Sequence, residues 1–359
     1  MYERIVALQE VLREEKLESI LVTDPANVFY LTGLWDQVGK GFWVFVCQNN
    51  FWVITSVFYK NIIEEKVSAS HLIMCSAEAS RSQKLLGLAG EINKIAFEKE
   101  SLSYAEYEFF EKVLSSKELV PCAGLVEKIR KIKDQKEIQK IKKAVKITDQ
   151  AFESALKIIK PGVSEIFIGR KIREIMEDMG AEGTAFDSIV ASGKNGADIH
   201  HTCSQKKIKT GEMVIIDIGA KYKEYCADFT RTIFIGKATP KFKNIYQIVL
   251  EVQKNSISRC NAGSSIGGSF SAVVDDFKKY GESENFIHAL GHGVGVEIHE
   301  LPHIGRYDNQ GSFEDGMVVA IEPGLYYKDF GGVRIEDLCL IAGKCKPMSK
   351  VSKELIEIL

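Results

Sequence analysis

The sequence lacks several features that would place it in a common class of protein. No apolar run approaches the ~18 residues needed to cross a bilayer, and the N-terminus alternates charged with apolar residues instead of forming a signal peptide's apolar core. Lys and Arg number 47 against 49 Asp and Glu, which disfavours a dedicated nucleic-acid binder. None of the eight cysteines forms a C-x-x-C pair, so zinc ribbons are not expected. We expect a cytoplasmic protein with reduced thiols that binds neither nucleic acid nor a membrane.

The sequence does have enough length for more than one domain. Its 359 residues correspond to two domains at ~150 residues each. In the first third, helical and strand patterns alternate, which predicts an α/β domain over residues 1–122. In residues 123–359, predicted strands follow one another in pairs, and helices stand in blocks between them. This order predicts an α+β domain with an antiparallel sheet.

A strongly basic stretch joins these two parts of the chain. Residues 128–146 carry nine Lys or Arg but only two acidic residues. The stretch could form a nucleic-acid or anionic-surface patch, but no aromatic residues interleave with the basic ones. Apolar residues recur at helical spacing, as at Ile138, Ile141 and Val145. We therefore predict a long helix with a solvated basic face.

Four acidic residues of the second domain stand in or beside strongly apolar predicted strands. Asp217 lies in Val-Ile-Ile-Asp-Ile-Gly and Asp228 eleven residues later, so a hairpin would bring them to neighbouring positions. Glu322 ends Val-Val-Ala-Ile-Glu, and Glu336 lies in a predicted strand over 333–341. Buried carboxylates are costly unless they are paired or bound to a cation. Arg334, two residues before Glu336 and on the same face of that strand, cannot balance four acids.

Histidines complete the set, since six of the seven lie between residues 200 and 303. His292 lies in Gly-His-Gly-Val-Gly, where glycines allow close approach to a ligand. Four carboxylates and one imidazole would balance two divalent ions. Because the set holds no thiolate, it suits Mn²⁺, Co²⁺ or Zn²⁺. Two such ions ~3.5–4 Å apart would share a water molecule and lower its pKa.

A second metal motif is less convincing. Residues 299–303 match the H-E-x-x-H pattern of zinc proteases, which needs a helix to bring His299 and His303 to one metal. Pro302 inside such a helix would cost ~3 kcal/mol. We therefore favour the two-metal site.

The ordered set of five residues resembles the metal site of the M24 metallopeptidases, which have the pita-bread fold. The set comprises Asp217, Asp228, His292, Glu322 and Glu336. The surrounding motifs, Phe-Ile-His-Ala-Leu-Gly-His-Gly-Val-Gly and Gly-Val-Arg-Ile-Glu-Asp, are most similar to the branch that contains Xaa-Pro dipeptidase (prolidase) and aminopeptidase P. The resemblance implies an N-terminal creatinase/prolidase-type domain before the catalytic domain. Creatinase-like members and histone-chaperone domains of this fold lose the metal ligands, whereas all five are present here, which disfavours a pure binding module.

The resemblance also implies roles for individual residues. Asp228 and Glu336 would bridge the two metals, Asp217 would hold one, and His292 and Glu322 the other, with Glu322 also shuttling protons. Three further residues complete the implied machinery: His299 and His288 at the substrate and the tetrahedral intermediate, and Arg334 behind the carboxylates. The family's other histidine falls on His200. Because Asp-Ile-His-His replaces the typical Pro-His-Gly, His200 and His201 both remain candidates.

These inferences together predict a two-metal exopeptidase that cleaves the bond between an N-terminal residue and a following proline. Its expected partner is a small peptide with proline in second position, and the resemblance implies a homodimer. Mn²⁺ or Co²⁺ is the expected metal, with Zn²⁺ as an alternative. Two other hypotheses remain: a peptide-binding module without turnover, and an aminopeptidase that does not require proline.

Overall fold

The computed structural model describes residues 1–36, 39–64, 66–76, 78–306 and 311–359. These residues form two compact units, Met1–Arg130 and Lys131–Leu359. The predicted boundary fell after Cys122. Helix α6 (Leu125–Arg130) follows that point but belongs to the first unit, because its Leu125 and Val126 are buried in the first unit's apolar core.

The first unit is built on a six-stranded sheet in the order β4-β3-β2-β1-β5-β6. The hairpin β2–β3 and the β1–β2 pair are antiparallel, whereas β4, β5 and β6 pair in parallel with their neighbours. The strands are β1 (Ser19–Val22), β2 (Phe42–Cys47), β3 (Phe51–Ser56), β4 (Leu72–Cys75), β5 (Lys94–Glu98) and β6 (Glu118–Cys122). The remaining helices are α1 (Tyr2–Glu14), α2 (Pro25–Thr32), α3 (Lys60–Ile63), α4 (Glu78–Ala89) and α5 (Tyr104–Val113), with short 3₁₀ turns at Val57–Tyr59 and Ala69–His71.

The second unit contains two main sheets, β20-β12-β9-β8 and β14-β13-β15-β18-β19, and two smaller ones, β11-β10-β7 and β16-β17. All their pairings are antiparallel except β12 with β20. The first strands are β7 (Gly183–Thr184), β8 (Ile189–Ser192), β9 (Met213–Ile218), β10 (Ala220–Tyr222), β11 (Tyr225–Cys226), β12 (Phe229–Ile235) and β13 (Gly291–Gly293). The others are β14 (Glu300–Ile304), β15 (Val318–Ile321), β16 (Gly324–Tyr327), β17 (Gly331–Arg334), β18 (Asp337–Ala342), β19 (Lys344–Pro347) and β20 (Ile356–Ile358).

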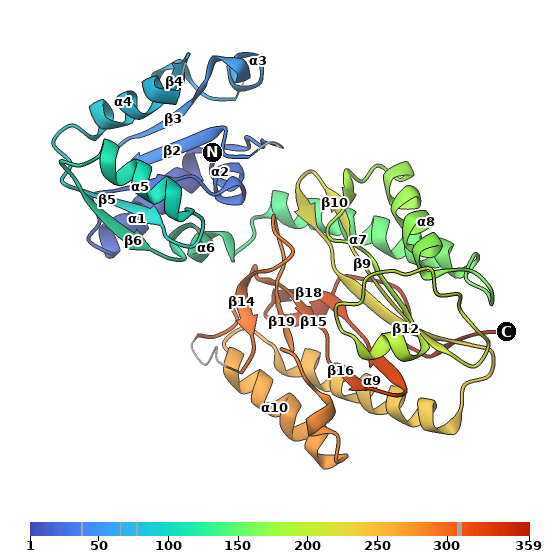
Figure 1. Ribbon diagram of the computed structural model, residues 1–359. Coiled ribbons are helices and arrows are strands. Elements are labelled where there is room, and N and C mark those ends of the chain that lie inside the picture. The colour runs from blue at the N-terminus through green and yellow to red at the C-terminus, as the bar shows by residue number, and fades with distance from the viewer. Residues whose placement is uncertain (37–38, 65, 77, 307–310) are drawn as a thin grey trace. The chain divides into compact units, whose positions relative to one another are not determined.

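Two pairs of helices cover these sheets from outside (Figure 1). The helices are α7 (Gln135–Leu156), α8 (Glu165–Asp178), α9 (Pro240–Arg259) and α10 (Ile266–Lys279), with 3₁₀ turns at Gly193–Ala197 and Ser283–Asn285. Apolar residues of α7 and α8 pack on β8, β9 and β12, and those of α9 and α10 pack on β14, β15 and β18. The strands between the helix pairs carry the polar site described below. Among the described residues, no helix is both long and apolar enough to span a bilayer.

The basic stretch forms two helices rather than the single helix predicted. Asp134 follows the short gap after α6 and is the N-cap of α7. Its side chain accepts a hydrogen bond from the Glu137 amide at 2.8 Å. The Glu137 carboxylate in turn accepts from the Asp134 amide at 2.9 Å. This reciprocal capping box starts a new helix, and most of the lysines of α7 lie on its exposed face.

A buried arginine on β12 ties the chain segments behind the site together. Arg231 donates to the Asp337 carboxylate at 2.8 Å, to the Glu336 carbonyl at 2.5 Å and to the carbonyls of Val351 and Ser352 at 3.0 Å. Both Arg231 and Asp337 are 1% exposed. Lys353 Nζ also lies 2.7 Å from Asp337 Oδ2, so loss of the guanidinium would remove one of two cations from this buried carboxylate and the donor from these carbonyls, which is costly.

We expect Arg231→Met to lower the free energy of unfolding by ~3 kcal/mol, as is typical when one partner of a buried ion pair is removed. Urea denaturation followed by circular dichroism measures this change. Lys254→Met is the control, since its pair with Glu354 is largely exposed, and it should leave the midpoint nearly unchanged. Equal effects of the two substitutions would contradict the structural role of Arg231.

Candidate metal centre and active site

A pocket of about 650 Å³ in the second unit is lined by every candidate site residue predicted from the sequence. Its lining combines an acidic group, an arginine and several imidazoles. The predicted site residues that line it are His200, Asp217, Asp228, His288, His292, His299, Glu322, Arg334 and Glu336. His201 and His303 line the same pocket.

Two of the acids lie opposite each other where two strand ladders are interrupted. Ile321 pairs with Asp337 at the end of β15–β18, and Gly324 pairs with Arg334 at the start of β16–β17. The same register places Glu322 across from Glu336 in the gap between the ladders. The predicted continuous strand over 333–341 is therefore wrong at this point.

The other two acids come from the β9–β12 hairpin, as the sequence predicted. Asp217 on β9 is paired with Thr230 on β12, and Asp228 stands two residues before Thr230. Residues two apart on a strand share a face, so both carboxylates point to the same side. Glu336 joins them because its amide donates to the Thr230 carbonyl at 3.1 Å, and its Oε2 accepts from Thr230 Oγ1 at 2.7 Å.

His292 on β13 presents one ring nitrogen to these acids. Its Nδ1 lies 3.0 Å from the Gly293 carbonyl, so Nδ1 carries the proton and the lone pair is on Nε2. Nε2 lies 3.6 Å from Asp228 Oδ2 and 3.5 Å from Glu322 Oε1. Strand β13 can pack closely against β15 because position 291 is glycine. A Cβ at that position would lie 1.8 Å from the Ala320 carbonyl oxygen.

The donor atoms are arranged as a cation would require. Ligand atoms of Asp228, His292 and Glu336 all lie within 4.8 Å of one another. Among the residues that the structure describes, Asp217 Oδ1 and Glu336 Oε1 are buried without a hydrogen-bond partner. Buried oxygen atoms of this kind are costly unless something binds them. The residues therefore fit hard or borderline divalent ions.

The pKa values of the side chains in this pocket also indicate a site for a cation. Burial raises the pKa of Asp228 and of Glu336 well above the usual range, and the neighbouring carboxylates raise both further. Burial likewise raises the pKa of Glu322 to about 8, against the lowering effect of Arg334. Burial lowers the pKa of His292 to about 3. The raised pKa values favour the protonated form of these carboxyls when no metal ion is bound. A bound cation would displace the protons.

Sequence reasoning missed the residues that organise Arg334. The buried guanidinium donates to Asp217 Oδ2 at 2.5 Å, to the Tyr326 hydroxyl at 2.8 Å and to Thr230 Oγ1 at 3.3 Å. Through Thr230 it also supports Glu336. Tyr326 and Thr230 are uncharged residues of types that are common in strands, so only the strand register reveals their role.

The pocket histidines differ in how they are engaged. His288 Nδ1 lies 2.7 Å from the Ala289 carbonyl and its Nε2 lies 3.0 Å from the Tyr326 hydroxyl, so both ring nitrogens have partners. His299 is exposed to the pocket and lies against the His292 ring, with centroids 4.3 Å apart. Among the described residues, no hydrogen bond is found for the His299 ring. His299 is thus available to a ligand.

The alternative H-E-x-x-H motif has no helix. Glu300–Ile304 form strand β14, in which His303 pairs directly with His292. The Glu300 carboxylate forms a buried ion pair with Lys133 Nζ at 2.5 Å, so it is not placed to serve as a base. This arrangement is incompatible with the helical zinc site.

Comparison with known proteins identifies the family. Residues 139–342 match metallopeptidase family M24, and residues 4–132 match the creatinase/prolidase N-terminal domain. The chain is 35% identical to the Xaa-Pro dipeptidase of Pyrococcus furiosus over 99% of this chain and 100% of that protein. Its structure matches an Xaa-Pro dipeptidase from Bacillus anthracis with a TM-score of 0.94 at 34% identity, covering 99% of both chains. An X-Pro aminopeptidase from Thermotoga maritima matches with a TM-score of 0.88 at 28% identity, covering 100% of this chain and 99% of that one.

The chain belongs to metallopeptidase family M24. The predicted fold class, an α/β N-terminal domain followed by an α+β pita-bread domain, is confirmed. The prediction of a metallo-exopeptidase, which acts on peptides with the help of divalent metal, is confirmed as well.

Proposed function

We propose that this protein is a two-metal exopeptidase that hydrolyses the bond between an N-terminal residue and a following proline, either as a dipeptidase or as an aminopeptidase. The observation that carries the proposal is the convergence of five donor side chains and unpaired buried oxygens in one pocket. The similarity to both Xaa-Pro dipeptidases and an X-Pro aminopeptidase supports the choice of bond.

In this proposal, five residues would hold the two ions: Asp228 and Glu336 would be shared between them, Asp217 would bind one, and His292 and Glu322 would bind the other. The ligand atoms of Asp228, His292 and Glu336 lie within 4.8 Å of one another, which supports the proposal that these residues hold ions at one centre. Bound ions would polarise the scissile carbonyl and lower the pKa of a bound water.

The remaining side chains would transfer protons during the reaction, stabilise the developing negative charge, or hold other residues in place. Glu322 lies at the edge of the acidic group and is less buried than Glu336. It would accept the proton of the attacking water at its carboxylate and pass it to the leaving nitrogen. His299 would donate to the developing oxyanion. Arg334 holds Asp217 in place, and His288 orients Tyr326 beside Arg334. His200 lines the same pocket and would contact the substrate.

We also propose that Mn²⁺ or Co²⁺ is the native metal, with Zn²⁺ as the alternative, and that the protein is a cytoplasmic homodimer whose catalytic domain is the second unit, Lys131–Leu359. The lack of thiolates in the donor set supports the metals. Elemental analysis of the isolated protein and sedimentation in solution test the metal and the dimer.

One assay tests the proposed reaction. Purified protein is stripped with a chelator, reloaded separately with Mn²⁺, Co²⁺ or Zn²⁺, and given Xaa-Pro dipeptides and longer Xaa-Pro peptides. We expect no turnover after stripping and restored turnover with Mn²⁺ or Co²⁺. Release of free proline from dipeptides identifies a dipeptidase, and release of the first residue from longer peptides identifies an aminopeptidase.

Matched peptides with alanine in place of proline serve as controls. Equal turnover of the alanine peptides would favour an aminopeptidase without proline preference. Peptide binding without turnover under every metal would favour a binding module. Full activity in the stripped protein would contradict the two-metal proposal.

A further inference from the structure

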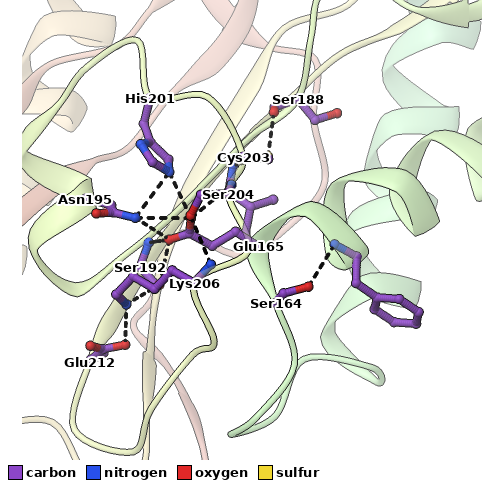
Figure 2. A network of polar contacts seen from close by, with 12 residues as sticks. Ser164, Glu165, Ser188, Ser192, Asn195, His201, Cys203, Ser204, Lys206 and Glu212 are labelled. Atoms are coloured by element: carbon purple, nitrogen blue, oxygen red, sulfur yellow. Dashed lines mark hydrogen bonds and ion pairs between the residues drawn. The ribbon is translucent and has the colours of Figure 1, made fainter.

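A buried glutamate beneath the pocket wall holds together the loop that carries His200 and His201. Glu165, the first residue of α8, is 0% exposed. Figure 2 shows side chains from three parts of the loop over residues 192–204 pointing toward its carboxylate. Oε1 accepts from the Ser192 amide at 2.8 Å and the Ser192 hydroxyl at 2.7 Å. Oε2 accepts from the Ser204 hydroxyl at 2.6 Å and lies 2.9 Å from His201 Nε2.

The middle of the loop is held by the same carboxylate. Asn195 Nδ2 donates to Oε1 at 3.0 Å and to Oε2 at 3.1 Å, and it lies 3.3 Å from His201 Nε2. Outside this group, Lys206 Nζ donates to the Ser192 hydroxyl at 2.6 Å and to Glu212 at 2.8 Å. Glu165 thus fixes both ends and the centre of the loop.

The Glu165 carboxylate is charged at neutral pH despite its burial. Burial acts to raise its pKa, but the hydrogen bonds from Ser204, Ser192 and His201 outweigh burial and lower the pKa to about 2. Hydrogen bonds to a charged acceptor are stronger than neutral ones. The loop is therefore held by a rigid, ionic centre rather than by isolated contacts.

The two consecutive histidines occupy different environments. Both residues line the pocket, but the His201 side chain is 13% exposed and its Nε2 is directed to Glu165, whereas His200 is exposed. The His200 amide donates to Asp198 Oδ1 at 3.1 Å, which restrains the backbone at this point. His201 is therefore engaged by the Glu165 carboxylate, and His200 is the more exposed of the two pocket histidines.

We propose that Glu165 and His201 act as a positioning pair that holds His200 against the substrate, and that His201 itself does not contact substrate or metal. This inference rests on the proposed function, in which His200 contacts the substrate. It assigns different tasks to the two histidines that the sequence leaves equivalent.

A double-mutant cycle on the metal-loaded enzyme tests the pair. His201→Ala should lower kcat/KM for an Xaa-Pro peptide by roughly tenfold, mainly through KM, because coupled contacts of this kind are worth a factor of that order. In a His200→Ala background the same substitution should change kcat/KM by less than about twofold. His201→Gln keeps an amide donor for Glu165 and should restore most of the loss. Metal content should stay unchanged in all four proteins.

Hydrogen exchange of residues 193–203, followed by mass spectrometry on the full chain, gives a readout that does not depend on turnover. Exchange should rise in His201→Ala but not in His201→Gln or His200→Ala. Additive losses in the cycle, or unchanged exchange and KM in His201→Ala, would overturn the positioning role. If the wild-type protein cleaves no Xaa-Pro peptide, the proposed function fails, and the exchange experiment still decides whether His201 holds the loop.

Discussion

Glu336→Ala is expected to lose at least one metal ion per chain and essentially all turnover. Glu336 is 1% exposed, and its Oε1 is buried without a partner among the described residues. It lies opposite Glu322 and close to both Asp228 and His292, so no neighbouring side chain can take over a bridging position. Elemental analysis and the Xaa-Pro assay measure the two losses. Glu336→Gln, which keeps the hydrogen bond with Thr230, should fold normally and show the same losses.

The matched control is His303→Ala, which removes a histidine of the same pocket. His303 lies on strand β14 rather than on a helix, and we expect its removal to leave the metal content unchanged. Thermal unfolding of each variant shows whether a loss reflects folding. If metal stoichiometry falls in His303→Ala and survives in Glu336→Ala, the five-ligand assignment is wrong.

His299→Ala is expected to keep two metals per chain while kcat falls by ~10²–10³, the usual effect of removing one oxyanion donor. The His299 ring lies against His292 without a hydrogen bond among the described residues, and burial lowers its pKa. In the proposed mechanism, this neutral ring would lie close to the reacting carbonyl. Because this contact forms chiefly in the transition state, KM should change little.

His288→Ala distinguishes this role from that of the other pocket histidine. Both His288 nitrogens are engaged with protein groups, so its removal should act through Tyr326 and Arg334 and should cost less in kcat than the removal of His299. Near wild-type kcat in His299→Ala with intact metal content would remove His299 from the mechanism.

Much of the fold could be predicted because many of its strands are marked by residue patterns within the strand itself. The apolar run before Asp217 and the alternating pattern after Asp228 form the expected hairpin β9–β12. The break at Ile335 and Glu336 could not be predicted, because Val-Arg-Ile-Glu-Asp is a good strand pattern locally. The chain leaves the ladder there because the Glu336 amide bonds to Thr230, more than a hundred residues away in sequence.

The candidate site was predictable in its acids, its arginine and its histidines, but not in its uncharged supporting residues. Asp217, Asp228, Glu322 and Glu336 stand out because a carboxylate in an apolar strand needs a reason to be buried. A tyrosine or a threonine in a strand needs none, so Tyr326 and Thr230 give no signal. The different environments of His200 and His201 depend on Glu165, which lies on a separate helix and carries no motif that links it to them.

The gap between the two ladders also governs which changes in chain length the site tolerates. Glu322 and Glu336 face each other because the β15–β18 and β16–β17 ladders share one register. An extra residue between Ile321 and Gly324 would shift one ladder against the other and turn a glutamate away. The turn at residues 328–330 lies beyond the last pair, Tyr327 with Gly331, so insertions there leave the pairing intact. Related proteins can therefore vary in the spacing between their two glutamates if the change falls in that turn.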